Sequence, residues 1–250
     1  MRVRVTFAVE AEFAPWRKLR KFSENNESLC KIYTARFSEL EVDVLLTGIG
    51  GKSAWLETIK RAWNGDVDIC VSSGLAGALL EKYNLGEVLA ANSVQSGGRK
   101  RKILCDTELV AAALAAGARE AESFYSAESV IISADNKREL GKTADAVEME
   151  SGEVLYEASA FGARVVAIRG ISDTADEELP LDFNRVMTSS GEVSMRRVLG
   201  QVAMHPGKVP SLIRFGQQSR MAAEKLCEFL DRYVEGLRKV LPAVSKEAAR

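Results

Sequence analysis

Asp145-Ala-Val-Glu-Met-Glu-Ser-Gly152, followed by Arg164-Val-Val-Ala-Ile-Arg-Gly-Ile-Ser-Asp-Thr-Ala-Asp176, decides the fold that we expect. The first stretch predicts a short strand ending in acids. Apolar residues at helical spacing over about 151–161 then predict a helix closed by Gly162. The β-branched run over 164–168 is typical of a strand buried on both faces. Two strands joined by a helix therefore deliver ionisable residues at their carboxyl ends, where parallel α/β sheets bind ligands.

The bulk composition is that of a soluble globular protein. The chain has 250 residues, 46% of them hydrophobic and 28% charged, with a formal net charge of -1. This balance gives no electrostatic reason to bind nucleic acid. We expect no transmembrane segment and no signal peptide, because no apolar run is long enough. Four scattered cysteines without a CxxC pair indicate reduced thiols in a cytoplasmic protein.

Strands and helices alternate along the chain, which predicts a single α/β domain over residues 1–241. Residues 182–241 form its helical C-terminal part, and the polar residues 242–250 are expected to be a flexible tail. Before the deciding stretch, we expect strands at 2–9, 29–37, 42–47, 68–73, 86–94 and 130–133. A first helix is expected from Glu10 through the basic run Arg17–Lys21, with Pro15 in its first turn. Further helices are expected at 52–63, at 107–116 and at 136–142, and Thr107 would cap the second of these.

Several familiar motifs fail on spacing. Gly48-Ile-Gly-Gly-Lys-Ser53 has Leu46 where a phosphate loop needs glycine, and a dinucleotide fingerprint would need glycine at Ser53. This argues against a dinucleotide-dependent oxidoreductase and predicts a tight strand-to-helix turn, whose backbone N–H groups could still line a site. A single histidine, His205, and no G-x-S-x-G elbow argue against a serine hydrolase and a zinc site.

Ser73-Gly-Leu-Ala-Gly77 follows a predicted buried strand, and we expect it to be a loop. Its glycines would let the backbone approach a ligand closely. A plain turn fits the same spacing equally well.

Carboxylates follow three predicted strands: Glu10 and Glu12, then Glu148 and Glu150, then Asp173. A single exposed acid is usually a solvated charge. Three such strand ends together suit chemistry in which positive charge develops. Cleavage of a glycosidic bond is such a reaction, since it needs one acid and one carboxylate that holds water.

Several motifs occur in the order seen in one superfamily: residues 7–12, 47–50, 73–77, 85–88, 146–151 and 166–176. In these motifs the chain resembles the purine nucleoside phosphorylase and uridine phosphorylase superfamily over about residues 1–178. The closest pattern is similar to the methylthioadenosine/S-adenosylhomocysteine nucleosidases. The resemblance implies a single three-layer α/β/α domain around a twisted mixed β-sheet, here with an extended helical C-terminus, which cleaves the N-glycosidic bond of a purine nucleoside.

The resemblance also implies residue roles. Asp173 would assist protonation of the leaving purine, and Glu12 would position the nucleophile. Glu150 would bind the ribose hydroxyls and Met149 would pack on the sugar. The remaining implied residues are Glu148, Ser73, Gly74, Leu75 and Ser172 on the substrate side, and Arg169 and Gly50 on the nucleophile or anion side. No metal and no cofactor is implied, with phosphate as a possible co-substrate.

The sequence departs from the family pattern at three places. Leu75 stands where the nucleosidases commonly have serine, and no arginine lies near Ser72 as in bacterial purine phosphorylases. Water and phosphate therefore both stay open as nucleophile. The segment 133–146 is short and carries Asp135-Asn-Lys-Arg138 instead of an aromatic residue that stacks on the base.

These departures leave other functions open. The short form, with Gly-Leu-Ala-Gly at 74–77 and a lysine-containing segment before residues 147–151, is similar to the hopanoid-associated phosphorylases, which act on an adenosylated lipid precursor. A non-catalytic nucleoside-binding protein is a further alternative. The apolar stripe expected along 211–240 fits a homodimer surface, and it fits packing within one chain as well.

Overall fold

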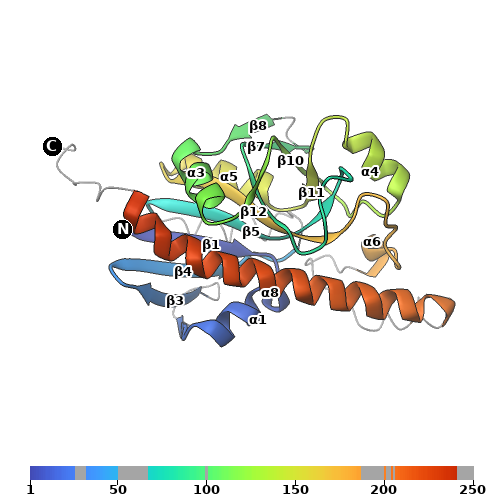
Figure 1. The fold of residues 1–250 in the computed structure, drawn as a ribbon, viewed down its shortest axis with the longest axis horizontal. Helices are drawn as coiled ribbons and strands as arrows, with labels where there is room; N and C mark the ends of the chain where they lie inside the picture. The colour runs from blue at the N-terminus through green and yellow to red at the C-terminus, as the bar shows by residue number, and fades with distance from the viewer. Residues whose placement is uncertain are drawn as a thin grey trace.

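The computed structural model describes residues 1–25, 32–49, 67–98, 101–186, 200, 204 and 206–240. Most helices follow the first eight strands there, and one long helix is the last element (Figure 1). The elements are β1 (Arg2–Phe7), α1 (Glu10–Leu19), β2 (Ser23–Asn25), β3 (Ile32–Phe37), β4 (Leu40–Leu46), β5 (Ile69–Ala78), β6 (Val88–Ala91), β7 (Ser93–Ser96), β8 (Arg101–Leu104), α3 (Thr107–Ala115), β9 (Arg119–Ala121), β10 (Phe124–Ser126), α4 (Ala134–Leu140), β11 (Ala146–Glu148), α5 (Ser151–Ala160), β12 (Arg164–Asp173), α6 (Phe183–Val186), the 3₁₀ turn η1 (Pro206–Lys208) and α8 (Val209–Val240).

The described strands form one mixed sheet of 12 strands, with β5 near its centre. β5 pairs in parallel with β1 on one side and with β12 on the other. Beyond the end of β1, β5 pairs antiparallel with β11 at Gly77 and Ala78. The expectation that the two acid-bearing strands run parallel is therefore wrong. Glu148 and Asp173 still line the same cavity, because β11 starts beside the end of β5 and runs back along it.

Helices cover both faces of the sheet, as expected for three layers. Arg169 and Gly170 are neighbours on β12, so they point to opposite faces. Arg169 contacts Ser151 at the start of α5, whereas a Cβ on Gly170 would lie 3.1 Å from the Ala222 carbonyl of α8. α8 also contacts α1 and α3 (Figure 1). The predicted three-layer α/β/α domain with a twisted mixed sheet and a helical C-terminus is confirmed.

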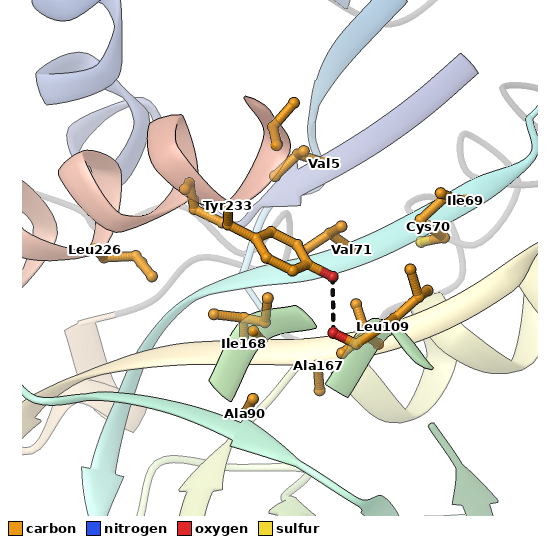
Figure 2. Packing of buried hydrophobic residues seen from close by; sticks show 14 of the residues in the cluster. Val5, Ile69, Cys70, Val71, Ala90, Leu109, Ala167, Ile168, Leu226 and Tyr233 are labelled. Atoms are coloured by element: carbon orange, nitrogen blue, oxygen red, sulfur yellow. Dashed lines mark hydrogen bonds between the residues drawn. The ribbon is translucent and has the colours of Figure 1, made fainter. Parts of the chain in front are cut away.

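The core lies between α8 and the centre of the sheet. All residues of β12 from Val165 to Asp173 are buried, which confirms the strand predicted at its start and extends it. Figure 2 shows Tyr233 and Leu226 of α8 close to Ile168 and Val71, with the Tyr233 hydroxyl donating to the Leu109 carbonyl at 3.2 Å. The apolar stripe of the last helix is thus buried within this chain from Ala222 to Leu237, whereas Leu212 and Phe215 nearer its start are only partly buried.

Several local expectations are wrong. Residues 73–77 are not a loop: they continue β5, because their backbone pairs with β12 from Ile168 to Asp173. Residues 130–133 are not a strand, since Val130 exchanges hydrogen bonds with the Asn184 side chain instead of a ladder. The strand expected at 86–94 is two strands, because β6 pairs with β9 and β12 whereas β7 pairs with β8 and β10.

Two details at the helix starts differ from expectation. Asp106, not Thr107, caps α3, because its carboxylate accepts the N–H groups of Glu108 and Leu109. α1 begins at Glu10, as expected, and Pro15 therefore lies in its second turn and not its first. The expected helix at 52–63, most of the segment 187–205 and the tail 242–250 lie outside the described residues. Within the described part, no helix combines the length and apolar character needed to span a membrane.

We predict that Gly170→Ala destabilises the fold by about 1–3 kcal/mol, because the new methyl group would lie 3.2 Å from Leu226 Cβ and 3.1 Å from the Ala222 carbonyl. Gly236→Ala is the matched control, since it adds a methyl group to α8 in open space and is expected to stabilise by about 0.5–1 kcal/mol. Denaturant unfolding measures both. Equal stability of the two variants would contradict the close packing of α8 on β12.

Candidate active site

A cavity of about 580 Å³ lies where the ends of β1, β5, β11 and β12 meet α1, α6 and α8. Its volume and mostly apolar lining suit a small-molecule site. The polar lining comes from the sheet side and the apolar lining from the helices. The residues used below are Ala8, Val9, Glu12, Pro15, Leu75, Gly77, Glu148, Met149, Glu150, Ser172, Asp173, Phe183, Phe215 and Ala223.

Most of the expected site residues come together here. The cavity lining includes Asp173, Glu12, Glu150, Met149, Glu148, Leu75 and Ser172. Among the described residues, Ser73, Gly74 and Arg169 lie behind the lining. Gly50 lies outside the described residues. Glu10 is on the surface of α1, where it pairs with Arg17 at 2.5 Å.

Glu12 is held by backbone N–H groups from two elements. Its Oε2 accepts from the N–H of Ala8 at 3.0 Å and of Val9 at 3.4 Å, at the start of α1. Its Oε1 accepts from the N–H of Leu75 on β5 at 3.0 Å. Burial raises the pKa of Glu12 above its usual value, while the charge of Arg169 and these N–H groups act in the opposite direction. A positioned carboxylate with a raised pKa is suited to act as a general base.

Arg169 is fully buried on β12 beside several acids. Its Nη2 donates to Glu148 at 2.5 Å and to Ser151 at 2.9 Å, and lies 3.6 Å from Glu150. Burial alone would lower the pKa of Arg169, but Glu148, Glu150 and Glu12 together raise it. The guanidinium therefore stays positively charged, and the neighbouring carboxylates compensate for the cost of burying that charge.

Gly74 makes the approach of Arg169 and Glu12 possible. Its φ is +138°, and a Cβ there would lie 2.4 Å from Arg169 Nη1 and 3.2 Å from both Glu12 carboxylate oxygens. Any side chain at this position would push the guanidinium and the carboxylate apart. Gly74 thus contributes to the site by leaving space for these two side chains, behind the cavity wall.

Glu148 organises the turn between β11 and α5. Its Oε2 accepts the N–H groups of Glu150 at 2.9 Å and of Ser151 at 2.7 Å, in addition to the Arg169 guanidinium. Satisfying free N–H groups at a helix start fixes the direction of that helix. The same side chain therefore sets the positions from which Met149 and Glu150 reach the cavity.

Asp173, the last residue of β12, is held at both oxygens. The Ser172 hydroxyl donates to Oδ1 at 2.7 Å and the Lys137 ammonium to Oδ2 at 2.5 Å. Gly77 leaves room for this carboxylate, because a Cβ there would lie 2.7 Å from Oδ2. We missed Lys137 from the sequence, where it stands in a charged run. Its spacing of three residues from both Ala134 and Leu140 was the available signal.

The described residues contain no group of three or more His, Cys, Asp or Glu side chains arranged to hold a metal ion. Cys70, Cys105 and Cys227 are free and buried. Burial raises the pKa of Cys105 to about 11, so this thiol is protonated at neutral pH. None of these three cysteines is among the residues that line the cavity.

Comparison with known proteins identifies the family. Residues 5–235 match the Phosphorylase superfamily, and the chain belongs to it. This confirms the resemblance noted in the sequence.

Solved structures of similar fold carry nucleosidase and hydrolase names. The methylthioadenosine/S-adenosylhomocysteine nucleosidase of Campylobacter jejuni superposes with a TM-score of 0.71 at 17% identity, covering 94% of this chain and 99% of that one. The corresponding S. pneumoniae nucleosidase, bound to a transition-state inhibitor, gives 0.71 at 17% identity, with coverage of 95% and 100%. Futalosine hydrolase of Helicobacter pylori gives 0.68 at 19% identity, with coverage of 94% and 97%.

Proposed function

We propose that this protein cleaves the N-glycosidic bond of a purine nucleoside of the adenosyl type and releases the free base. The observation that carries the proposal is the convergence of Glu12, Glu150 and Asp173 on one cavity from three separate strand ends. The family membership and the nucleosidase names of structures with the same fold support it. The reaction needs no cofactor.

Each group has a distinct task in this proposal. Glu150 accepts hydrogen bonds from the ribose hydroxyls while Met149 packs on the sugar. Asp173 stabilises the proton gained by the departing purine. Glu12 takes a proton from the nucleophile as it attacks the sugar carbon, which carries positive charge in the transition state. The surrounding carboxylates favour that positive charge.

We propose water as the nucleophile. The lining includes the carboxylates of Glu12, Glu148, Glu150, Asp173 and Glu224, against the cations of Lys18 and Arg220. Arg220 is largely exposed and pairs with Glu224 at 3.0 Å. Arg169 is enclosed behind the wall by its own acids. A phosphate dianion would meet more negative than positive charge here, whereas neutral water carries no such cost.

A second candidate substrate is an adenosylated lipid precursor. The helix side of the cavity is apolar, with Pro15 from α1, Phe183 from α6, and Phe215 and Ala223 from α8. This wall suits a bulky apolar group on the 5′ carbon of the ribose. A pocket that binds nucleosides without cleaving them is the remaining alternative.

The C-terminal half of the stripe on α8 packs within the chain, from Leu226 to Leu237. The homodimer and the cytoplasmic location stay predictions from the sequence.

We expect free adenine to be released from an adenosyl nucleoside without phosphate, and faster as the 5′ group becomes more apolar. Chromatography of adenosine, methylthioadenosine and a longer 5′-alkylthioadenosine, each with and without phosphate, measures this. Inosine is the control for the base. Release that depends on phosphate would contradict water as nucleophile, and no release from any substrate would favour the binding-only alternative.

A further inference from the structure

The Lys137 side chain is a buried charge beside Asp173 that has no task in the proposed reaction. It lies on α4 and is fully buried. Its ammonium group has three N–H donors, and each has an acceptor: Asp173 Oδ2 at 2.5 Å, the Thr174 carbonyl at 2.8 Å and the Glu177 carbonyl at 2.9 Å.

We infer that Lys137 is a positioning residue for the leaving-group acid, and the inference rests on the proposed function. A lysine that is enclosed in this way cannot touch the substrate, because all its donors are used within the protein. It can act on the reaction only through Asp173 and through the loop that follows it.

The geometry shows what Lys137 controls. Asp173 has its Oδ1 bonded by Ser172 and its Oδ2 bonded by Lys137, so the carboxylate cannot rotate about its last bond without losing one of the two. The carboxylate lies against Gly77, where it occupies the space that a side chain would take, because a Cβ there would lie 2.7 Å from Oδ2. Asp173 also lines the cavity, so the carboxylate held in this way is available to a purine bound there.

The charges around the pair support the same reading. Lys137 lies on α4 and Asp173 on β12. The exposed Asp176 of the loop after β12 interacts electrostatically with Lys137 and Arg138. Glu177 offers its carbonyl to Lys137, while its side chain lies 3.5 Å from Gln218 and 4.0 Å from Arg214 on α8. The ammonium group thus balances the charge of Asp173 and ties the loop over 174–177 to α4. Without it, Asp173 would be a buried carboxylate that lacks its counter-ion.

A double-mutant cycle tests the inference. The four proteins are the wild type, Lys137→Met, Asp173→Asn and the double variant, and kcat and KM for adenine release are measured for each. We expect Lys137→Met to lower kcat about 10- to 100-fold with a smaller change in KM, because a displaced catalytic group costs rate. In the Asp173→Asn background the same change should alter kcat by less than about twofold, because Lys137 acts through Asp173. Lys142→Met, on an exposed lysine that pairs with Glu139, is the control and should leave kcat unchanged.

Thermal unfolding shows whether each variant is folded under the conditions of the assay. The double variant removes both charges, so we expect its Tm to lie above that of Lys137→Met. If Lys137→Met does not fold, Lys137→Arg is measured instead and should lower kcat while keeping the cation. A wild-type kcat in that variant, or an equal loss from Lys137→Met in both backgrounds, would overturn the role of Lys137 alone. No adenine release from the wild type would overturn the proposed function together with it.

Discussion

Asp173→Asn is expected to lower kcat for base release by about 10²–10⁴-fold, the range found for groups that transfer a proton in the transition state. The asparagine keeps the shape of the side chain and loses the carboxylate that would stabilise the proton on the departing purine. Chromatography of the released base at saturating substrate measures the effect.

The variant also removes the counter-ion of Lys137, so the folded fraction has to be measured alongside the rate. Asp176→Asn is the matched control, because Asp176 is an exposed acid on the loop after β12 whose side chain accepts a hydrogen bond from Thr174. We expect this control to keep wild-type turnover. Wild-type turnover in Asp173→Asn itself would show that Asp173 takes no part in the chemistry.

Glu12→Gln is expected to lower kcat by about 10²–10⁴-fold for a different reason, since the amide cannot take a proton from the attacking water. In the wild type, kcat/KM should fall as the pH is lowered through the pKa of Glu12, which burial places above the usual value near 4.5. A rate profile across acidic pH measures this limb. Glu10→Gln, on the exposed face of the same helix, should leave both kcat and the limb unchanged.

The Glu12 carboxyl group also makes the free energy of unfolding depend on pH. Because the folded-state pKa of Glu12 is raised, its contribution is fully present below the unfolded value and is lost as the pH rises through the folded value. Glu12→Gln should remove this pH dependence from the free energy of unfolding. A variant that keeps both the acid limb and the pH-dependent stability would show that Glu12 is not the titrating base.

Much of the candidate site was predictable, because its ionisable residues lie within short sequence motifs at the ends of strands. Glu12, Met149, Glu150 and Asp173 all line the cavity as the resemblance implied. The buried strand after Gly162 and the amphipathic last helix followed from hydrophobic periodicity alone.

The rest depends on contacts between distant segments. Nothing in residues 146–148 shows that their strand runs antiparallel to β5. The glycines at 74 and 77 look like turn residues, yet they lie within a strand, because Arg169 and Asp173 occupy the space where their side chains would be. Lys137 looks like a solvated charge until α4 is placed against the end of β12. Each of these requires the fold before the side chain can be interpreted.

The most direct test of the central claim is the mass of the sugar formed when the protein acts on methylthioadenosine in water labelled with heavy oxygen, with phosphate present. We predict free adenine and one heavy oxygen on the sugar carbon that held the base, from attack by water positioned by Glu12. A sugar 1-phosphate without the label would contradict the assignment of water. An unchanged nucleoside, from this substrate and from its longer 5′-alkylthio analogue, would contradict cleavage of the N-glycosidic bond.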